Sequence, residues 1–401
     1  MKKMIGALLA LGALFTAAIA PASAAGEVDK SDNVKQVAQF QYTGGTELAS
    51  DGGHYLYATE MDGNDNRGQD PTKGGLHIID SNKMKEVGFL HCAGNDNDIE
   101  FLRPGLVVMS FAHNLCAPAA GSGMMFVDVK NPAKPRVISE LNTGKSHTLK
   151  PVPGTTLIYM AGGGYAGNPN NYGPAIVDWK NPYKPKVVAT TKTLTMDCHD
   201  ISFSITAEDR QLGFCAGAIG TGEVKIWDVS DPLAPALLGE IVNPAIQYSH
   251  YAVANHDGTL LAIDDEAAFV AHDCNTGQTP YGRIWFYDIT NPMVPILKSS
   301  WAAPAGRGGD GTSNIGTLVG WVSSWCLAHG VDWNPKTNNV AITWFTAGMS
   351  VLDLNDPAAP KEAAYFDTDD TLSYSSLWHD GLLWTNDMAR GAEAFAIKGL
   401  K

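Results

Sequence analysis

The sequence predicts an all-β fold, a seven-bladed β-propeller of four-stranded blades. The first observation is a motif that recurs along the chain, in which an alternating strand ends at Asp and a proline-containing turn follows. The second is that the segments between the motifs alternate apolar and polar residues, as β-strands do, with almost no helical periodicity. The third is the repeat length of 48 to 65 residues, which suits a four-stranded propeller blade.

The motif predicts a hairpin between the third and fourth strands of each blade. It is clearest in MFVDVKNPAKP (Met125–Pro135), AIVDWKNPYKP (Ala175–Pro185), VKIWDVSDPLAP (Val224–Pro235) and IWFYDITNPMVP (Ile284–Pro295). Its aspartates mark six repeats, at Asp80, Asp128, Asp178, Asp228, Asp288 and Asp353. Asp and the neighbouring Ser, Asn or Asp can cap a turn, and Pro fixes φ and blocks a helix. We therefore expect these aspartates to have a structural role.

The two ends of the chain are expected to meet. The seventh repeat, GAEAFAIKGL, ends the chain after its third strand and lacks both Asp and Pro. The segment VKQVAQFQY, Val34 to Tyr42, can supply the missing outer strand. Its pairing with the last blade would close the ring and leave no free sheet edge.

Residues 1–24 are typical of a signal peptide, and residues 25–401 then form a single propeller domain. Lys2 and Lys3 precede an apolar segment from Met4 to Ala20, and Ala22-Ser23-Ala24 forms a small-x-small cleavage site. We therefore expect a periplasmic or secreted protein.

No later stretch approaches the roughly 18 apolar residues of a membrane span. Without the leader, 26 basic residues face 42 acidic ones, a charge of −16, which disfavours nucleic acid and anionic membranes as partners.

The motif strands resemble a known repeat. GLHIID, MMFVDVKNP, VKIWDVSDP and MSVLDLNDP are similar to the LVIVD repeat, which is found in secreted and surface bacterial propellers. The resemblance covers the whole mature chain, although the first copy has Ser81-Asn82-Lys83 where a proline is usual. It implies the propeller architecture but no particular activity, because the fold is a scaffold on which function resides in individual sites.

Four histidines form the main candidate site. The entries to the innermost strands of a propeller gather around one channel mouth, and in this chain they are Thr46, Asn97, His147, His199, His250, His329 and Ser375. Imidazoles from consecutive blades are suited to a transition metal, copper first and iron or zinc next. In the alternative interpretation each histidine bonds the backbone of the next blade.

The loops after the second strands add ionisable groups to the same face, namely Glu60, His113, Asp265, Glu266 and Asp387. Of these, His113, Glu266 and Asp387 are predicted to transfer protons or to support the metal ligands. Two long insertions, Glu266 to Gly282 and Trp301 to Ala328, also fall there. Trp321 and Trp325 would either line a pocket or simply pack.

Six cysteines in an exported chain favour disulfides. The blade arrangement predicts the pairs Cys92–Cys116, Cys198–Cys215 and Cys274–Cys326, each stapling a loop at the rim. The alternative is a copper–thiolate site.

Other familiar sites are weak or missing. DGNDNRG, Asp62 to Gly68, resembles a calcium loop, but Lys73 stands where a bidentate Glu is required. The sequence has no GxSxG, no GxxxxGK[ST] and no strand-to-helix GxGxxG motif, which disfavours the corresponding hydrolase and nucleotide sites.

Three functions are compatible with these features. The first is a metal-dependent enzyme acting on a small molecule, of oxidoreductase or of hydrolase or lyase type. The second is a non-catalytic module that binds a protein, glycan or surface polymer through the rim loops. The third is a copper or zinc carrier.

Overall fold

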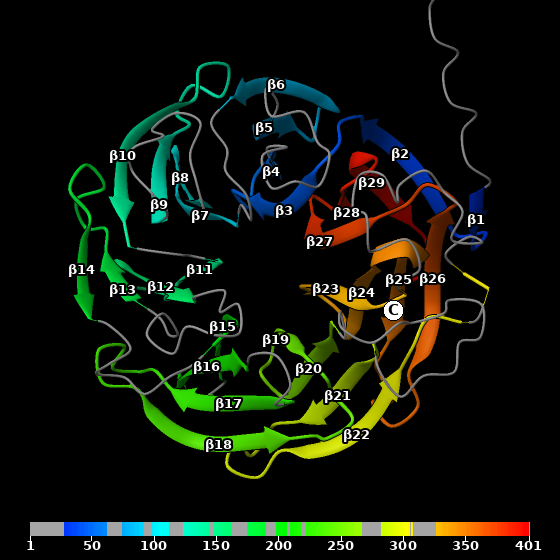
Figure 1. Cartoon of the computed structure of the whole chain (residues 1–401). Helices are drawn as coiled ribbons and strands as arrows, with labels where there is room; N and C mark the ends of the chain where they lie inside the picture. The colour runs from blue at the N-terminus through cyan, green and yellow to red at the C-terminus, as the bar shows by residue number, and fades with distance from the viewer. Residues whose placement is uncertain are drawn as a thin grey trace, which may run out of the picture.

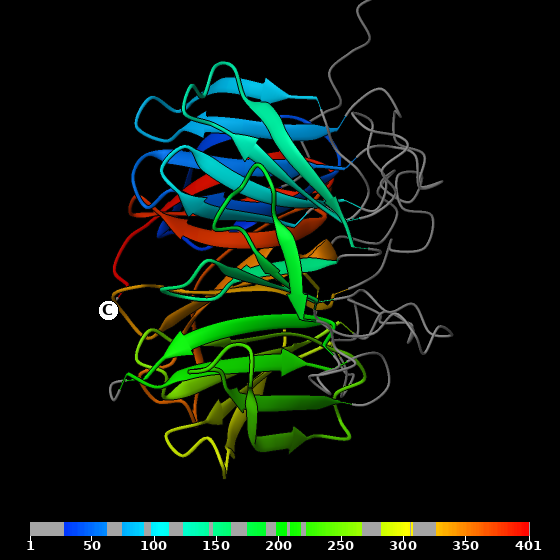
Figure 2. The ribbon, with the colours of Figure 1, turned by 90° about the vertical axis from the view of Figure 1, so that its left-hand side faces the viewer.

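The structure, a computed structural model, describes residues 28–61, 74–91, 98–111, 123–143, 147–161, 175–189, 198–206, 209–217, 222–266, 282–304, 306–307 and 326–400. Seven antiparallel sheets are arranged radially around one axis (Figure 1). The chain is therefore a seven-bladed β-propeller, which confirms the predicted fold. Seen edge-on, the strands run between the two faces of the ring (Figure 2).

The first three blades follow one another along the chain. Blade 1 comprises β3 (Gly45–Ser50), β4 (Tyr55–Glu60), β5 (Gly75–Asp80) and β6 (Lys85–Leu90). Blade 2 comprises β7 (Ile99–Arg103), β8 (Leu106–Phe111), β9 (Gly123–Asp128) and β10 (Arg136–Asn142). Blade 3 comprises β11 (Thr148–Pro151), β12 (Leu157–Ala161), β13 (Ala175–Asp178) and β14 (Lys186–Ala189).

The next blades continue the same order. Blade 4 comprises β15 (Asp200–Ile205), β16 (Gln211–Ala216), β17 (Glu223–Asp228) and β18 (Ala236–Val242). Blade 5 comprises β19 (Ser249–Ala254), β20 (Leu260–Asp265), β21 (Ile284–Asp288) and β22 (Ile296–Trp301). Blade 6 comprises β23 (Ala328–Trp333), β24 (Asn339–Trp344), the 3₁₀ turn η2 (Phe345–Ala347), β25 (Met349–Asp353) and β26 (Lys361–Thr368).

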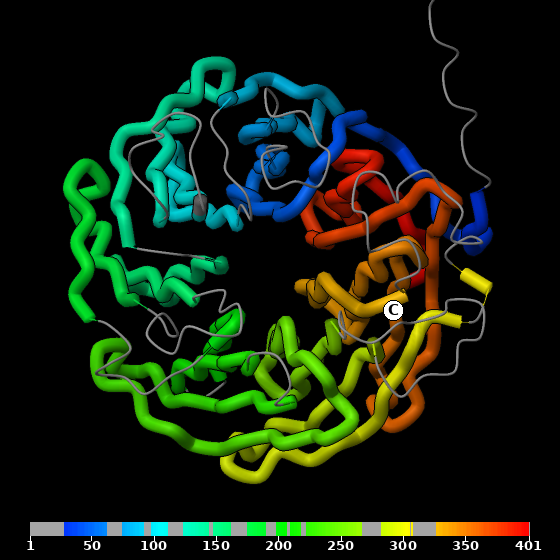
Figure 3. The backbone as a smooth tube through the Cα atoms, in the orientation of Figure 1, coloured from blue at the N-terminus to red at the C-terminus, as the bar shows by residue number. Residues whose placement is uncertain are grey.

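Blade 7 joins the two ends of the chain. It comprises β27 (Ser373–His379), β28 (Leu382–Asp387), β29 (Gly391–Ile397) and, as its outer strand, β2 (Val34–Phe40). The register pairs Val34 with Ile397, and Figure 3 shows the first and last segments side by side. The predicted closure is confirmed. An additional strand, β1 (Val28–Lys30), pairs with β26 and makes blade 6 five-stranded.

The repeated motif forms the predicted hairpins, and its aspartates cap their turns. The Oδ1 atoms of Asp128, Asp178, Asp228, Asp288 and Asp353 each accept a hydrogen bond from the backbone N–H two residues later. In each turn the next Asn or Asp repeats the arrangement, as in Asp231 Oδ1, which accepts from Leu233 N at 3.1 Å. These side chains replace backbone partners at the turn, so their role is structural, as expected.

The proline turns also lock neighbouring blades together. Each fourth strand has a register shift. In several blades a small residue just beyond the shift meets a proline carbonyl of the next blade. Ser139 and Ser299 donate to the carbonyls of Pro182 and Pro357. A Cβ on Gly239 would overlap the Pro292 carbonyl oxygen. The turn of the motif therefore also contacts the fourth strand of the preceding blade.

The hydrophobic core lies between adjacent blades. One cluster, for example, joins Tyr57 and Ile78 of blade 1 to Val107, Met125 and Val127 of blade 2. Because every blade packs on two neighbours, the closed ring holds the inner strands in fixed relative positions. Within the described residues, no helix is long and apolar enough to cross a membrane.

Several predictions concern residues outside those described. They are the leader 1–24, the calcium-like loop with Lys73, His113, Trp321, Trp325, Cys92, Cys116 and Cys274.

Candidate metal centre at the channel mouth

The fold brings the four predicted histidines to one place. His147 and His199 directly precede β11 and β15, whereas His250 and His329 lie near the starts of β19 and β23. These innermost strands contact one another in order around the axis (Figure 1). The shared position in each blade, found from the repeat, therefore becomes a shared position in space.

The imidazole rings form a continuous arc. Ring centroids are separated by 4.3 Å between His147 and His199, by 4.7 Å between His199 and His250 and by 4.3 Å between His250 and His329. His147 and His250 are 6.1 Å apart. Ligand atoms of His147, His199 and His250 all lie within 4.8 Å of one another. That spacing is compatible with several nitrogens meeting one ion.

Glu266 lies at the other end of the arc. Its Oε2 is 3.5 Å from His250 Nε2, and its Oε1 is 3.9 Å from His329 Nε2. His250, Glu266 and His329 thus form a second group of three ligand atoms within 4.8 Å of one another. Predicted as a proton-transfer group, Glu266 is also placed to act as an oxygen ligand.

Three of the imidazoles, those of His199, His250 and His329, are held in their neutral form. Burial lowers the pKa of His329 to about 3. Burial, and then the positive charge that neighbouring imidazoles would carry, lower the pKa of His199 and His250 well below the usual value. A neutral imidazole has a nitrogen lone pair available for a metal. Loading this site with a cation would therefore need no deprotonation of these groups at neutral pH.

Two contacts orient the rings. His329 Nδ1 lies 2.8 Å from the Tyr374 carbonyl oxygen, so Nδ1 carries the proton and Nε2 the lone pair. His250 Nδ1 faces Asp264 Oδ2 at 3.8 Å, and neither buried atom has a hydrogen-bond partner. A small movement of either side chain would bring His250 and Asp264 within hydrogen-bond distance.

Tyr248 and Asp264 are parts of the site that the sequence analysis missed. The Tyr248 hydroxyl lies 2.7 Å from His199 Nδ1 and 3.0 Å from Nε2. Asp264 is the last-but-one residue of β20 and directly precedes the Asp265-Glu266 pair that the pattern did identify. Only its position could have identified Tyr248, which precedes His250 by two residues at the entry to the same strand.

Asp387 has a different setting from the one predicted. Its Oδ2 accepts hydrogen bonds from Thr371 Oγ1 at 2.7 Å and from Leu372 N at 2.9 Å. Its Oδ1 accepts from the backbone N–H groups of Ala389 and Arg390. The carboxylate therefore fastens the loops of blade 7, and it is not among the ligand groups that the described residues form.

One predicted disulfide is present. Cys198 and Cys215 are bonded, which places the staple directly before His199. Cys326 is also disulfide-bonded, to a cysteine outside the described part of the chain.

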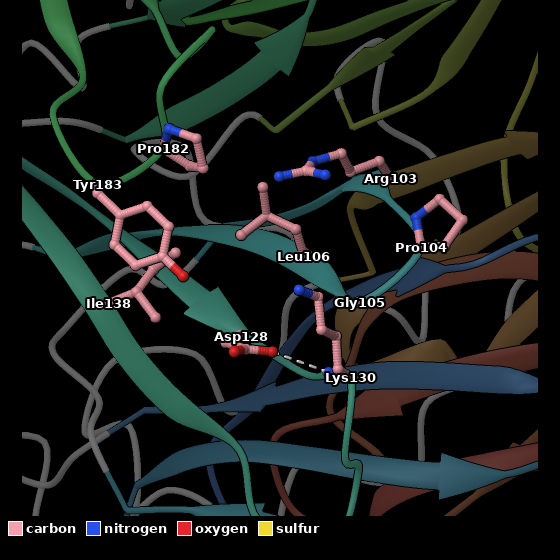
Figure 4. Close-up of a pocket in the computed structure, with 9 residues that line it drawn as sticks. All are labelled: Arg103, Pro104, Gly105, Leu106, Asp128, Lys130, Ile138, Pro182 and Tyr183. Atoms are coloured by element: carbon pink, nitrogen blue, oxygen red, sulfur yellow. Dashed lines mark hydrogen bonds between the residues drawn. The ribbon is translucent and has the colours of Figure 1, made fainter.

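A small pocket on the outer part of the ring is a different feature (Figure 4). Its volume is about 60 Å³, and it lies between the β7–β8 turn and the proline turn of the next blade. Lys130 N donates to Asp128 Oδ1 beside it. Its lining belongs to the packing of neighbouring repeats, so we do not assign it a function.

Comparisons with known proteins support the fold only. No protein-family model matches the chain, and no curated protein matches its sequence. Among solved structures, the chain is similar to the β-propeller domain of Cps50 (Swd1) from Myceliophteria thermophila, with a TM-score of 0.56 and 11% identity. The similarity covers 91% of this chain and 100% of that domain. At this identity the likeness establishes a β-propeller and no shared activity.

Proposed function

We propose that this chain is an exported transition-metal protein, and that its metal centre acts on a small molecule at the channel mouth. The observation that carries the proposal is the convergence of four imidazoles, three of them buried, and one carboxylate from neighbouring blades. The disulfide beside His199 is consistent with an oxidising compartment outside the cytoplasm. The proposed localisation is the periplasm or the medium.

The ligand set favours a first-row transition metal. His147, His199 and His250 supply three nitrogens, and Glu266 with His329 completes the arc. Imidazole-rich sites suit copper, iron or zinc, whereas Ca²⁺ and Mg²⁺ require oxygen ligands. Copper is the first choice, because it has the highest affinity of these ions for nitrogen sites.

The residues around the centre have separate roles in this proposal. The four histidines hold the ion, which would supply a Lewis acid or a redox couple. The Tyr374 carbonyl and Asp264 orient His329 and His250. Tyr248, whose hydroxyl contacts His199, is placed to hydrogen-bond to a group bound at the ion. Glu266 either completes the coordination or accepts a proton from that group.

Metal content decides the proposal. Protein exported to the periplasm and purified without chelator should contain about one transition-metal ion per chain. The variant His199→Ala/His250→Ala should lose the metal, because His250 belongs to both ligand groups and His199 to the first of them.

The matched control is His256→Ala, which removes an imidazole in the β19–β20 turn, away from the arc. Equal metal content in the double variant and the parent protein would overturn the proposal, as would a parent protein without metal.

A further inference from the structure

A group of charged side chains lines the channel beside the histidines. Glu47 comes from β3, Asp98 and Glu100 from β7 and its entry, and Asp200 from β15. We call these four the channel carboxylates. Tyr251 of β19 reaches across the ring from blade 5 to blade 1, and its hydroxyl donates to Glu47 Oε1 at 2.8 Å. The group is therefore drawn together from several blades.

One ammonium group stands among these four carboxylates. Lys150 of β11 pairs with Glu100, and the negative charges of Glu100, Asp98 and Asp200 raise its pKa against the effect of burial. Burial and the repulsion of Asp98 raise the pKa of Glu47 to about 7. Lys150 is therefore the cation that Glu100, Asp98 and Asp200 share.

Asp200 supplies an independent observation. Asp200 is only 1% exposed, and its Oδ2 atom has no hydrogen-bond partner. The charges nearest to it are Lys150, Asp98 and Glu47. A buried acceptor left without a partner costs about 1–3 kcal/mol, and more when it is charged. A donor in the channel would remove that cost.

The spacing of the carboxylates selects the kind of cation. Among the described residues, the groups able to place three ligand atoms within 4.8 Å of one another all contain histidine, and none is made of channel carboxylates. A bare Ca²⁺ or Mg²⁺ needs oxygens closely grouped around it. An ammonium group instead directs three N–H donors at separated acceptors.

Two side chains of this group keep contact with solvent. The side chains of Lys150 and Glu100 are 28% and 20% exposed although they stand on innermost strands. Asp200 directly follows His199, and Asp98 lies within electrostatic reach of His147. A molecule held here would adjoin the histidine arc.

We propose that the channel carboxylates bind the primary ammonium group of a small organic amine, and that such amines are the substrate class of the metal centre. Ammonium binding depends only on the carboxylates. The assignment as a substrate rests on the proposed function, because it requires a metal at the histidine arc.

Calorimetric titration with methylammonium and propylammonium tests the binding. We expect saturable binding above the raised pKa of about 7 of Glu47 and Glu100, where these two carboxylates are ionised. Tetramethylammonium has no N–H donors, and the channel carboxylates do not form the compact oxygen cage that Ca²⁺ requires. Neither ion should therefore compete with methylammonium for the site. Asp200→Asn should weaken binding at least about tenfold, since a hydrogen bond to a charged group contributes about 1.5–3 kcal/mol. Asp353→Asn makes the same charge change in a surface turn and should leave binding unaltered.

Glu47→Gln provides a second variant should Asp200→Asn fail to fold, and it should also weaken binding. The idea is overturned if methylammonium does not bind, if both channel variants bind it normally, or if Ca²⁺ displaces it. The titration is repeated on His199→Ala/His250→Ala. Ammonium binding that survives in that variant supports this proposal even where the metal proposal fails.

Discussion

Asp264 is the residue that most directly links the described geometry to the proposed metal. Its Oδ2 faces His250 Nδ1 at 3.8 Å, and both atoms are buried without partners. A carboxylate behind a ligating histidine fixes the ring and its tautomer. In the proposed function, Asp264 therefore acts on the metal through His250.

Asp264→Asn should accordingly lower metal affinity by about 10- to 100-fold, the usual loss when such a partner is changed. A competition titration against a chelator gives the affinity, and the spectrum of the bound ion should shift because the His250 ring is less constrained. Asp353→Asn is the matched control. Unchanged affinity and spectrum would show that Asp264 has only a structural role.

His77 supports a prediction on pH. The ring lies in blade 1, with Nδ1 3.1 Å from Glu86 and Nε2 3.2 Å from Glu60, and it stacks on Tyr42. Burial lowers the pKa of His77, but the hydrogen bonds to Glu60 and Glu86 outweigh it and raise the pKa overall. The pKa of His77 is thus higher in the folded protein than in the unfolded chain. Such a group stabilises the fold fully at a pH below its pKa in the unfolded chain. The stabilisation is lost as the pH rises through its pKa in the folded protein.

His77→Gln should therefore destabilise the protein more at about pH 5.5 than at about pH 9, two values on either side of the ordinary histidine pKa. Thermal unfolding of both proteins at each pH measures the difference. An equal loss of melting temperature at the two values would show that protonated His77 does not stabilise the fold.

At the level of single residues, the repeat predicted more than the composition did. The four histidines were found because they occupy one position in successive blades. Asp264 and Tyr251 could not be found in this way, because the pairing of β19 with β20 has a register shift between Ser249 and Ala252. Strict alternation sends neighbouring residues to opposite faces, whereas here His250 joins the histidine arc and adjacent Tyr251 reaches Glu47.

Among the structural elements, the proline turn connects neighbouring blades in addition to the hydrophobic core between them. Gly239 faces the Pro292 carbonyl, where Ser139 and Ser299 donate hydrogen bonds in other blades. The motif's hairpin could be inferred from Asp and Pro. Its contact with the next blade could not, because the receiving residue lies in another repeat.

Gly239→Ala should destabilise the protein by about 1–3 kcal/mol, the usual cost of overpacking. The measurement is denaturant unfolding. Gly53→Ala is the control, because its added Cβ would meet the end of the Asp51 side chain in an exposed turn. If both variants show the same small loss, the proline turns do not lock the blades.

The disulfide is a second element with a measurable contribution. Cys198 and Cys215 are separated by 17 positions, and closing a loop of that size contributes about 3 kcal/mol. Cys198→Ala/Cys215→Ala should lose stability of that order, and metal affinity should fall because the staple directly precedes His199. Unaltered metal affinity at reduced stability would limit the disulfide to a structural role.

For the whole molecule, closure by the N-terminal segment is decisive. β2 covers the edge of β29, and Asn33 adds hydrogen bonds to the carbonyls of Ala363 and Lys398. The missing strand of the last repeat allowed this closure to be predicted. β1 was not predicted, since three residues carry too little pattern to identify a strand.

Deleting residues 28–42 should leave an open edge on blade 7, which promotes association between chains. We expect a broadened thermal transition and oligomers by light scattering. Deletion of residues 28–30 alone removes β1 and should change both readouts much less. A monomeric variant without residues 28–42 that unfolds as sharply as the parent would show that the ring does not depend on this strand.

The central claim is that one metal ion joins imidazoles from successive blades. The most direct measurement is anomalous X-ray scattering from crystals of the exported protein, with data on both sides of the copper edge and of the other metal edges. We predict a single peak between His147, His199, His250 and His329, at about 2.0–2.3 Å from the nitrogens it contacts. The absence of any peak there, or a peak at another site with the four rings unchanged, would contradict it.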